Sequence, residues 1–169
     1  MAITKIQSES LNLADTYDFT GNVTGAGETL KPAFRAKLSA TQNVSSSTDV
    51  KAQFNTELFD TDSDYDNSTN YRFTPTTAGK YFVYAQIAHG WSSNWGHMNF
   101  TKIYKNGSEY TKGTFYGNGS GVQNYGTVAV SDIIDFNGSS DYVEIFGYSN
   151  SSGTQFDGNH SFFGAFKLF

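Results

Sequence analysis

The chain of 169 residues contains no cysteine and only 2 proline residues. The lack of cysteine excludes a disulfide framework and any metal site built on thiolates. Charged residues make up only 16% of the sequence, and the 11 Lys and Arg are scattered singly, so no basic stripe is present to follow a phosphate backbone. We therefore expect no nucleic-acid partner.

Long apolar runs are missing as well. The longest uninterrupted apolar stretch covers residues 81–85, which is far too short to cross a membrane, so we expect no membrane insertion. Residues 1–11 lack the basic and apolar blocks of a signal peptide, so we expect no export signal.

The sequence is instead rich in aromatic residues, with 15 Phe, 11 Tyr and 2 Trp. Aromatic rather than aliphatic surface must therefore build much of the core. Because disordered chains combine few apolar residues with high net charge, a net charge of -5 and this many rings favour a folded domain.

The first 30 residues differ from the rest of the chain. They contain few bulky apolar residues and no sustained helical period, and Gly25 and Gly27 stand shortly before Pro32. Glycine loosens the backbone, and the residue before a proline favours an extended conformation. We interpret residues 1–30 as an arm and residues 31–169 as one domain.

From residue 31 onward, short alternations of apolar and polar residues recur between turn signals, without a sustained helical period. This pattern predicts an all-β sandwich or jelly roll. Asn106-Gly107 and Asn137-Gly138 each predict a tight hairpin, because Asn-Gly supplies the positive φ angles of a type I′ turn. Other expected strands cover residues 32–40, 50–54, 79–89, 96–104, 127–130 and 161–169.

Successive side chains on a strand point to opposite faces, so the strand 79–89 places Tyr81 and Val83 on one face and Phe82 and Tyr84 on the other. Both faces are apolar or aromatic. A sandwich buries only one face of each sheet, so the second face must cover a neighbour, a ligand or another copy of the chain. Self-assembly is the simplest account; the alternative is that tyrosine rows tolerate solvent through their hydroxyl groups.

Several motifs follow one another at fixed spacing. Phe54 is followed by Asp60, Tyr65 and Phe73, and then by a Gly-x-Tyr at residues 79–81 that opens a central strand. These residues resemble the signature of the complement C1q globular-head family, a relative of the tumour necrosis factor fold. Further matches cover residues 32–36, 141–144 and 162–166, so that the resemblance extends over residues 31–169.

The resemblance implies a ten-stranded jelly roll that assembles as a homotrimer around an aromatic-lined axis. Residues 1–30 resemble the leaders of tail and appendage proteins of marine bacteriophages, which implies a virion location and docking to other virion proteins through this arm. The residues expected at the trimer interface are Phe82, Tyr84, Phe146, Tyr148, Phe163 and Phe166.

Two aromatic segments between expected strands are candidates for ligand contact. Trp91 and Trp95 lie in one of them, and Tyr116 and Tyr125 lie in a glycine-rich segment. Aromatic loops bind sugars by stacking, which favours a glycan as the ligand. The alternatives are that the indoles plug the end of the jelly roll or the trimer axis, and that the glycine-rich segment is an ordinary connection.

Asp60, Asp62 and Asp64 alternate along the chain, which suggests a calcium loop because hard cations bind several carboxylate oxygens. The EF-hand spacing is not met, since Tyr65 and Tyr71 stand where glycine and the closing glutamate are needed. A polar loop between strands is the alternative. We expect no other cofactor.

The sequence contains no Gly-x-Ser-x-Gly or His-Glu-x-x-His motif, and its three histidines are scattered. We therefore expect a non-enzymatic virion structural protein, a trimeric tail or appendage tip that adheres to a host-surface glycan. One alternative is a purely architectural decoration or cement protein. Another is a secreted carbohydrate-binding module.

Overall fold

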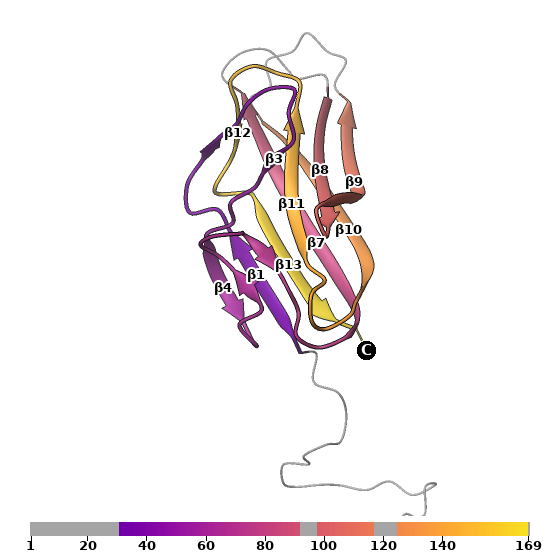
Figure 1. The fold of residues 1–169 in the computed structure, drawn as a ribbon. Helices are drawn as coiled ribbons and strands as arrows, with labels where there is room; N and C mark the ends of the chain where they lie inside the picture. Colours follow the sequence, from indigo (N-terminus) through magenta and orange to yellow (C-terminus); the bar gives the residue numbers. More distant parts are fainter. Residues whose placement is uncertain (1–30, 92–97, 117–124, 169) are drawn as a thin grey trace, which may run out of the picture.

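The computed structural model describes residues 31–91, 98–116 and 125–168. These residues form two antiparallel sheets that face each other (Figure 1). This part of the chain has no helix, and hence none that is long and apolar enough to cross a membrane. The predicted all-β sandwich is confirmed.

The described residues contain thirteen strands rather than the ten that the resemblance implied. Four of the thirteen, β2, β3, β5 and β6, have only two residues each. The strands are β1 (Ala33–Lys37), β2 (Gln42–Asn43), β3 (Val50–Lys51), β4 (Thr56–Asp60), β5 (Tyr65–Asp66), β6 (Arg72–Phe73), β7 (Gly79–Trp91), β8 (Met98–Lys105), β9 (Ser108–Tyr116), β10 (Tyr125–Phe136), β11 (Val143–Ser149), β12 (Thr154–Phe156) and β13 (Phe162–Lys167).

The first sheet, sheet A, is built around the long strand β7. Strand β10 pairs with one edge of β7 over its whole length, and β13 and β12 share the other edge. Strand β1 follows β13, and β4 follows β1, so that β10 and β4 lie at opposite margins of the sheet. Strand β2 pairs with β12.

The second sheet, sheet B, has the strand order β5, β6, β11, β8, β9, with β3 also paired to β11. Strands β8 and β9 form the hairpin that Asn106-Gly107 predicts, and these residues have φ angles of 52° and 80°. Both central residues therefore adopt the left-handed conformation that a type I′ turn requires.

The second predicted hairpin is wrong. Strand β10 belongs to sheet A and β11 to sheet B, so the segment that contains Asn137 crosses from one sheet to the other. Gly138 has a φ of 70°, but Asn137 does not adopt the left-handed conformation. Its side-chain Oδ1 instead accepts hydrogen bonds from the amides of Ser139, Ser140 and Asp141. Asn137 therefore caps a crossover turn.

The core between the sheets is aromatic, as the composition predicts. The ring of Phe34 stacks on Tyr65 and on Phe73 with centroid distances of 4.5 Å, and Phe163 meets it edge-on at 4.8 Å. The hydroxyl of buried Tyr65 donates a hydrogen bond to the carbonyl oxygen of Phe54, so its polar end is satisfied. The expected alternation on β7 is also confirmed, with Tyr81, Val83, Ala85 and Ile87 all turned into the core.

Candidate functional site

The outer face of sheet A carries a cluster of rings that we call the aromatic face, formed by Phe82, Tyr84, Phe162 and Phe166. Phe82 lies 5.9 Å from Tyr84 and 5.6 Å from Phe166 between ring centroids, and Tyr84 lies 6.1 Å from Phe162. All four side chains are only partly buried. Large apolar patches on a soluble domain mark interaction surfaces.

One cation lies within the aromatic face. The guanidinium of Arg35 on β1 is 4.9 Å from the centroid of the Phe162 ring, and its Nε is buried without a hydrogen-bond partner among the described residues. Burial raises the pKa of the nearby Tyr84 hydroxyl, although the positive charge of Arg35 opposes this shift. Tyr84 is therefore neutral at physiological pH.

The aromatic face also contains an open pocket of about 360 Å³ over β7 and β10, which Phe162 of β13 also lines. Ile133 lies opposite Phe82 in the β10–β7 pairing, and 53% of its side chain is exposed. The apolar surface therefore continues across β7 onto β10. The pocket is lined by Phe82, Tyr84, Ala85, Ala129, Val130, Ser131 and Phe162.

The six residues expected at a trimer interface do not share one surface. Phe82, Tyr84 and Phe166 belong to the aromatic face, but Phe163 is fully buried in the core and presents nothing to a partner. Its neighbour Phe162 takes that place because successive residues of β13 point to opposite faces. Phe146 and Tyr148 lie on β11, on the outer face of sheet B and thus on the opposite side of the sandwich.

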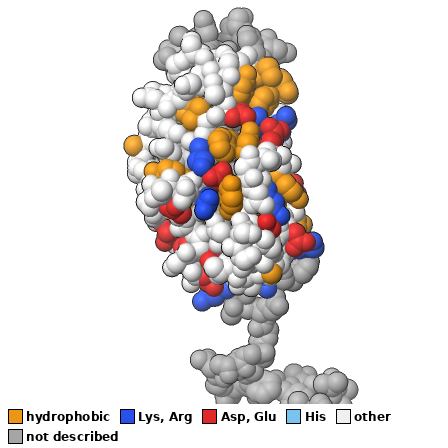
Figure 2. Space-filling view, in the orientation of Figure 1, with side chains coloured by type: hydrophobic (Ala, Val, Ile, Leu, Met, Phe, Trp, Pro, Cys, Tyr) orange, Lys and Arg blue, Asp and Glu red, His pale blue; other side chains and the backbone are white. Residues whose placement is uncertain are grey.

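The outer face of sheet B combines rings with paired charges. Phe100 stacks on Tyr148 at 5.2 Å, and Tyr104 lies 4.3 Å from Phe146 between ring centroids. Figure 2 shows hydrophobic, basic and acidic side chains next to one another on the face turned to the viewer. This face thus combines rings with paired charges.

The central cation of this second face is Lys102. Its Nζ lies 2.9 Å from Asp49 and 2.8 Å from Glu109. Burial alone would lower the pKa of Lys102, but the hydrogen bonds to Glu109 and Asp49 outweigh it and raise the pKa. Glu109 also contacts Lys112 at 3.1 Å. Because Lys112 is the cross-strand neighbour of Lys102, Glu109 separates two like charges.

Three of the four candidate ligand-binding residues lie at one end of the sandwich, the upper end in Figure 1. Strand β7 ends at Trp91, β9 ends at Tyr116 and β10 begins at Tyr125, where Tyr125 pairs with Gly90. Tyr116 is 64% exposed, and its ring meets Phe100 edge-on at 5.9 Å. Trp95 and the side chains of Trp91 and Tyr125 lie outside the described residues.

Two of the three aspartates considered for calcium, Asp60 and Asp64, accept hydrogen bonds from backbone amides in turns. Asp60 accepts hydrogen bonds from the amides of Asp62, Ser63 and Tyr65. Asp64 accepts one from the amide of Thr76, and burial raises the pKa of its carboxyl group. In the described ranges, no three His, Cys, Asp or Glu side chains are grouped so as to hold a metal ion. Asp60 and Asp64 therefore act as acceptors within a polar loop, and the calcium site stays a prediction.

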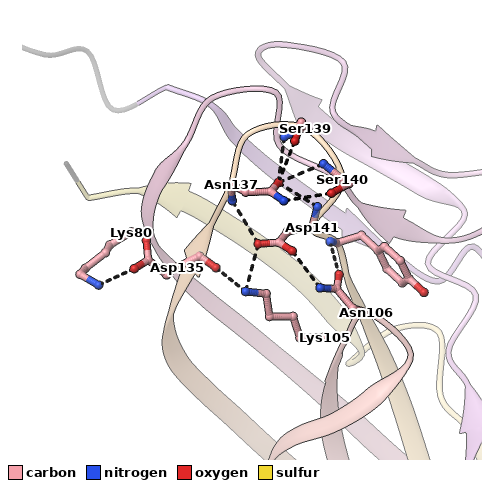
Figure 3. A network of polar contacts seen from close by, with 9 residues as sticks. Lys80, Lys105, Asn106, Asp135, Asn137, Ser139, Ser140 and Asp141 are labelled. Carbon is pink, nitrogen blue, oxygen red and sulfur yellow. Dashed lines mark hydrogen bonds and ion pairs between the residues drawn. The ribbon is translucent and has the colours of Figure 1, made fainter.

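Figure 3 shows a polar network at the other end of the sandwich that the sequence analysis did not predict. The side-chain amide of Asn106 makes two hydrogen bonds. Its Nδ2 donates to Asp141 Oδ1 at 2.8 Å, and its Oδ1 accepts from the backbone amide of Tyr142 at 3.0 Å. Lys105 Nζ lies 3.1 Å from Asp141 Oδ2 and donates to the carbonyl oxygen of Asp135. The pKa of the Asp141 carboxyl group is held below its usual value, chiefly by the hydrogen bond from the Asn106 side chain. The network joins the β8–β9 hairpin to the crossover after β10.

The described histidines do not form a catalytic arrangement. His89 is fully buried with its ring edge-on to Phe156, and burial lowers its pKa to about 4. His160 Nδ1 contacts Asp157 at 2.9 Å, but within the described residues no hydroxyl nucleophile is hydrogen-bonded to its ring.

No family model and no curated protein matches this sequence. Similarity to solved structures is clear, however. Murine APRIL at pH 5.0 is similar with a TM-score of 0.61 and 8% identity, over 80% of this chain and 98% of that one. The globular domain of zebrafish complement 1qA has a TM-score of 0.60 and 16% identity, over 82% and 98%. Eiger TNF from S. frugiperda has a TM-score of 0.54 and 12% identity, over 81% and 90%.

These comparisons establish the fold and nothing finer. The described residues form a jelly roll of the C1q and tumour necrosis factor type, as the motifs on either side of Tyr81 predict.

Proposed function

We propose that this chain is a non-enzymatic binding module that assembles as a homotrimer through the outer face of sheet A. The aromatic face carries the proposal, because its four rings, its pocket and the exposed Ile133 form one apolar surface. A single two-layer sandwich leaves such a surface in water, whereas a second copy of the chain covers it. The resemblance to the C1q globular head implies three copies.

A matched pair of substitutions tests this assembly. Phe82→Lys places a charge on the aromatic face, and Phe146→Lys places the same charge on the outer face of sheet B. Sedimentation or light scattering of the wild-type chain should give about three times its mass of 18.6 kDa. Phe82→Lys should reduce this to a monomer, and Phe146→Lys should not. A wild-type chain that stays monomeric at micromolar concentration overturns the proposal.

The upper end of the sandwich is the proposed site of adhesion, and a host-surface glycan is the proposed ligand. Its support is the exposed ring of Tyr116, which lies where β7, β9 and β10 also end or begin. The chain enters β1 at the opposite end, where the Lys167 amide donates a hydrogen bond to the carbonyl oxygen of Pro32. A trimer attached through residues 1–30 would thus present the upper end outward, and three weak contacts would add by avidity.

The proposed location is a virion, on a tail or appendage, where residues 1–30 bind other virion proteins. The resemblance of this arm to phage leaders supports the proposal. Immunolabelling of particles from the source of this gene should place the protein at a tip or appendage. Absence of label from all particles would count against a virion role.

A competition experiment, in which purified protein competes with particles for adsorption to the host, distinguishes an adhesive role from an architectural one. Purified protein should block adsorption, and Tyr116→Ala should weaken the block. Tyr110→Ala is the matched control, because Tyr110 is 50% exposed on the same strand but nearer the hairpin turn. If the protein does not block adsorption, and particles form only in its presence, the architectural alternative holds instead.

A further inference from the structure

The core between the two sheets differs in character between its two ends. Toward the lower end in Figure 1 it holds the rings packed around Phe34, whereas toward the upper end it holds polar side chains that are at most 1% exposed. We call this second set the polar layer. It comes from β7, β8, β11 and β12 and consists of His89, Asn99, Thr101, Ser149 and Thr154. Burial of polar groups stabilises less than burial of rings, so the sheets are held together less firmly at the upper end.

Hydrogen bonds satisfy hydroxyl groups of the polar layer. Thr101 Oγ1 donates to the carbonyl oxygen of Val128 at 2.8 Å. Thr154 Oγ1 donates to the carbonyl oxygen of Ser151 at 2.8 Å and lies 3.0 Å from Ser149 Oγ. These bonds offset the cost of taking the hydroxyl groups out of water, and they connect the strands of both sheets while the upper end is closed.

The imidazole ring of His89 lacks such bonds. Neither ring nitrogen has a hydrogen-bond partner, and the ring packs edge-on against Phe156 at a centroid distance of 5.5 Å. Unpaired polar atoms in a core cost free energy, and a proton on this ring would add a buried charge. Burial therefore lowers the pKa of His89 to about 4, although the backbone of Phe100 opposes this shift.

The strands around His89 supply no counter-charge from their described residues. Gly126 of β10 and Phe156 of β12 lie beside it in the sheet. Asp157, which follows Phe156, already accepts hydrogen bonds from His160. The other charged side chains of the neighbouring strands lie elsewhere, on the outer face of sheet B in the case of Lys102 and Glu144, and toward the lower end in the case of Lys80, Lys105, Asp132 and Asp135.

We propose that the upper end of the sandwich is an acid-sensitive opening, in which protonation of His89 parts the two sheets locally while the aromatic part of the core stays packed. The charged ring is hydrated in the opened end and desolvated in the closed one, so acid favours the opened form. Because the ring binds its proton with a pKa of 6.5 in water and about 4 in the closed end, the equilibrium constant for opening should rise about 20-fold between pH 7 and pH 5. The inference depends neither on the proposed homotrimer nor on a ligand.

Thiol labelling tests the inference, since the chain contains no cysteine of its own. Ser149→Cys places a thiol in the polar layer, and Val143→Cys places a matched thiol at the other end of the same strand, where the side chain is also buried. The rate of reaction with an aromatic disulfide reagent is measured at pH 7 and pH 5. Each rate is divided by that of the same variant unfolded in urea at the same pH. The normalised rate of Ser149→Cys should rise about 20-fold in acid, and that of Val143→Cys should stay slower at both pH values.

A background without His89 identifies the group that responds. His89→Leu in the Ser149→Cys chain should abolish the acid response, and His89→Gln serves the same purpose if leucine impairs folding. Circular dichroism verifies that each variant is folded at both pH values. Equal normalised rates for the two cysteine variants at pH 5 would show that the chain opens only as a whole. An acid response that survives without His89 would assign it to another group. Either result overturns the inference.

Discussion

The ring of Tyr84 lies over Gly164 of the neighbouring strand, so that a Cβ at position 164 would come within 2.5 Å of the Tyr84 ring. The same Cβ would approach the carbonyl oxygen of Phe34 to 2.9 Å. Glycine is therefore needed at this position, because any side chain would displace the tyrosine and press on the backbone of β1.

Gly164→Ala should lower both stability and self-association. Overpacking of this kind costs about 1–3 kcal/mol in the free energy of unfolding. Thermal melting measures the first effect, and light scattering measures the second. Thr114→Ala, on the exposed outer face of sheet B, should leave both unchanged. A fully stable, trimeric Gly164→Ala protein would show that Tyr84 can move aside without cost.

Phe162 and Phe163 should respond differently to the same substitution. Phe163→Ala removes a fully buried ring that contacts Phe34, Phe54 and Tyr65, and we expect a loss of about 3–5 kcal/mol in the free energy of unfolding. Phe162→Ala should cost less stability but should weaken the trimer. Urea unfolding and sedimentation distinguish the two, and the opposite pattern would contradict the assignment of faces on β13.

Asn106→Asp should destabilise the lower end of the sandwich. It replaces the amide that donates to Asp141 with a second carboxylate at the same short distance, and breaking such a satisfied contact costs about 1–3 kcal/mol. Ser139→Ala is the control, since its hydroxyl makes a single exposed hydrogen bond. Equal melting temperatures for Asn106→Asp and wild type would show that the network adds little.

This loss should depend on pH. The pKa of Asp141 is lowered in the folded chain, so its contribution to stability is present above the usual aspartate pKa and disappears as the pH falls through the folded value. The difference in melting temperature between Asn106→Asp and wild type should therefore shrink in acid. A difference that is constant from neutral to strongly acidic pH would exclude electrostatics as its cause.

His89 should make the wild-type chain lose stability in mildly acidic solution. Its pKa is about 4 in the folded state and 6.5 when unperturbed, so below pH 6.5 the unfolded chain binds the proton first. This difference in proton binding should lower the free energy of unfolding by about 3 kcal/mol between pH 6.5 and 4. His89→Leu should lack this loss, whereas His160→Asn, which alters an exposed ring, should keep it. Identical losses for His89→Leu and wild type would contradict the burial effect.

The faces of individual strands could be predicted from the sequence, but the sheet to which a strand belongs could not. A period of two places Phe146 and Tyr148 on one face of β11, as the structure confirms. It does not show that β11 lies in sheet B, opposite the sheet that carries Phe82. The predicted interface therefore combined two surfaces on opposite sides of the sandwich.

The two Asn-Gly pairs show the same limit for turns. Asn106 adopts a positive φ and closes a hairpin, whereas Asn137 uses its side chain to cap a crossover. The local sequence is alike around the two Asn-Gly pairs. Their different conformations arise from which strands pair with one another, and those strands are distant in the sequence. Likewise, the contact of Asn106 with Asp141 joins residues 35 positions apart, which no spacing rule predicts.

The hydrogen bond from the Lys167 amide to Pro32 places the start of the first strand and the end of the last strand side by side. Anything fused before residue 31 or after residue 168 would therefore emerge from the same pole of the jelly roll. A fluorescent protein or an affinity tag joined directly before residue 31 or after residue 168 would leave the far pole unobstructed. The domain is thus suited to display on a bead or nanoparticle with its opposite end accessible to solution.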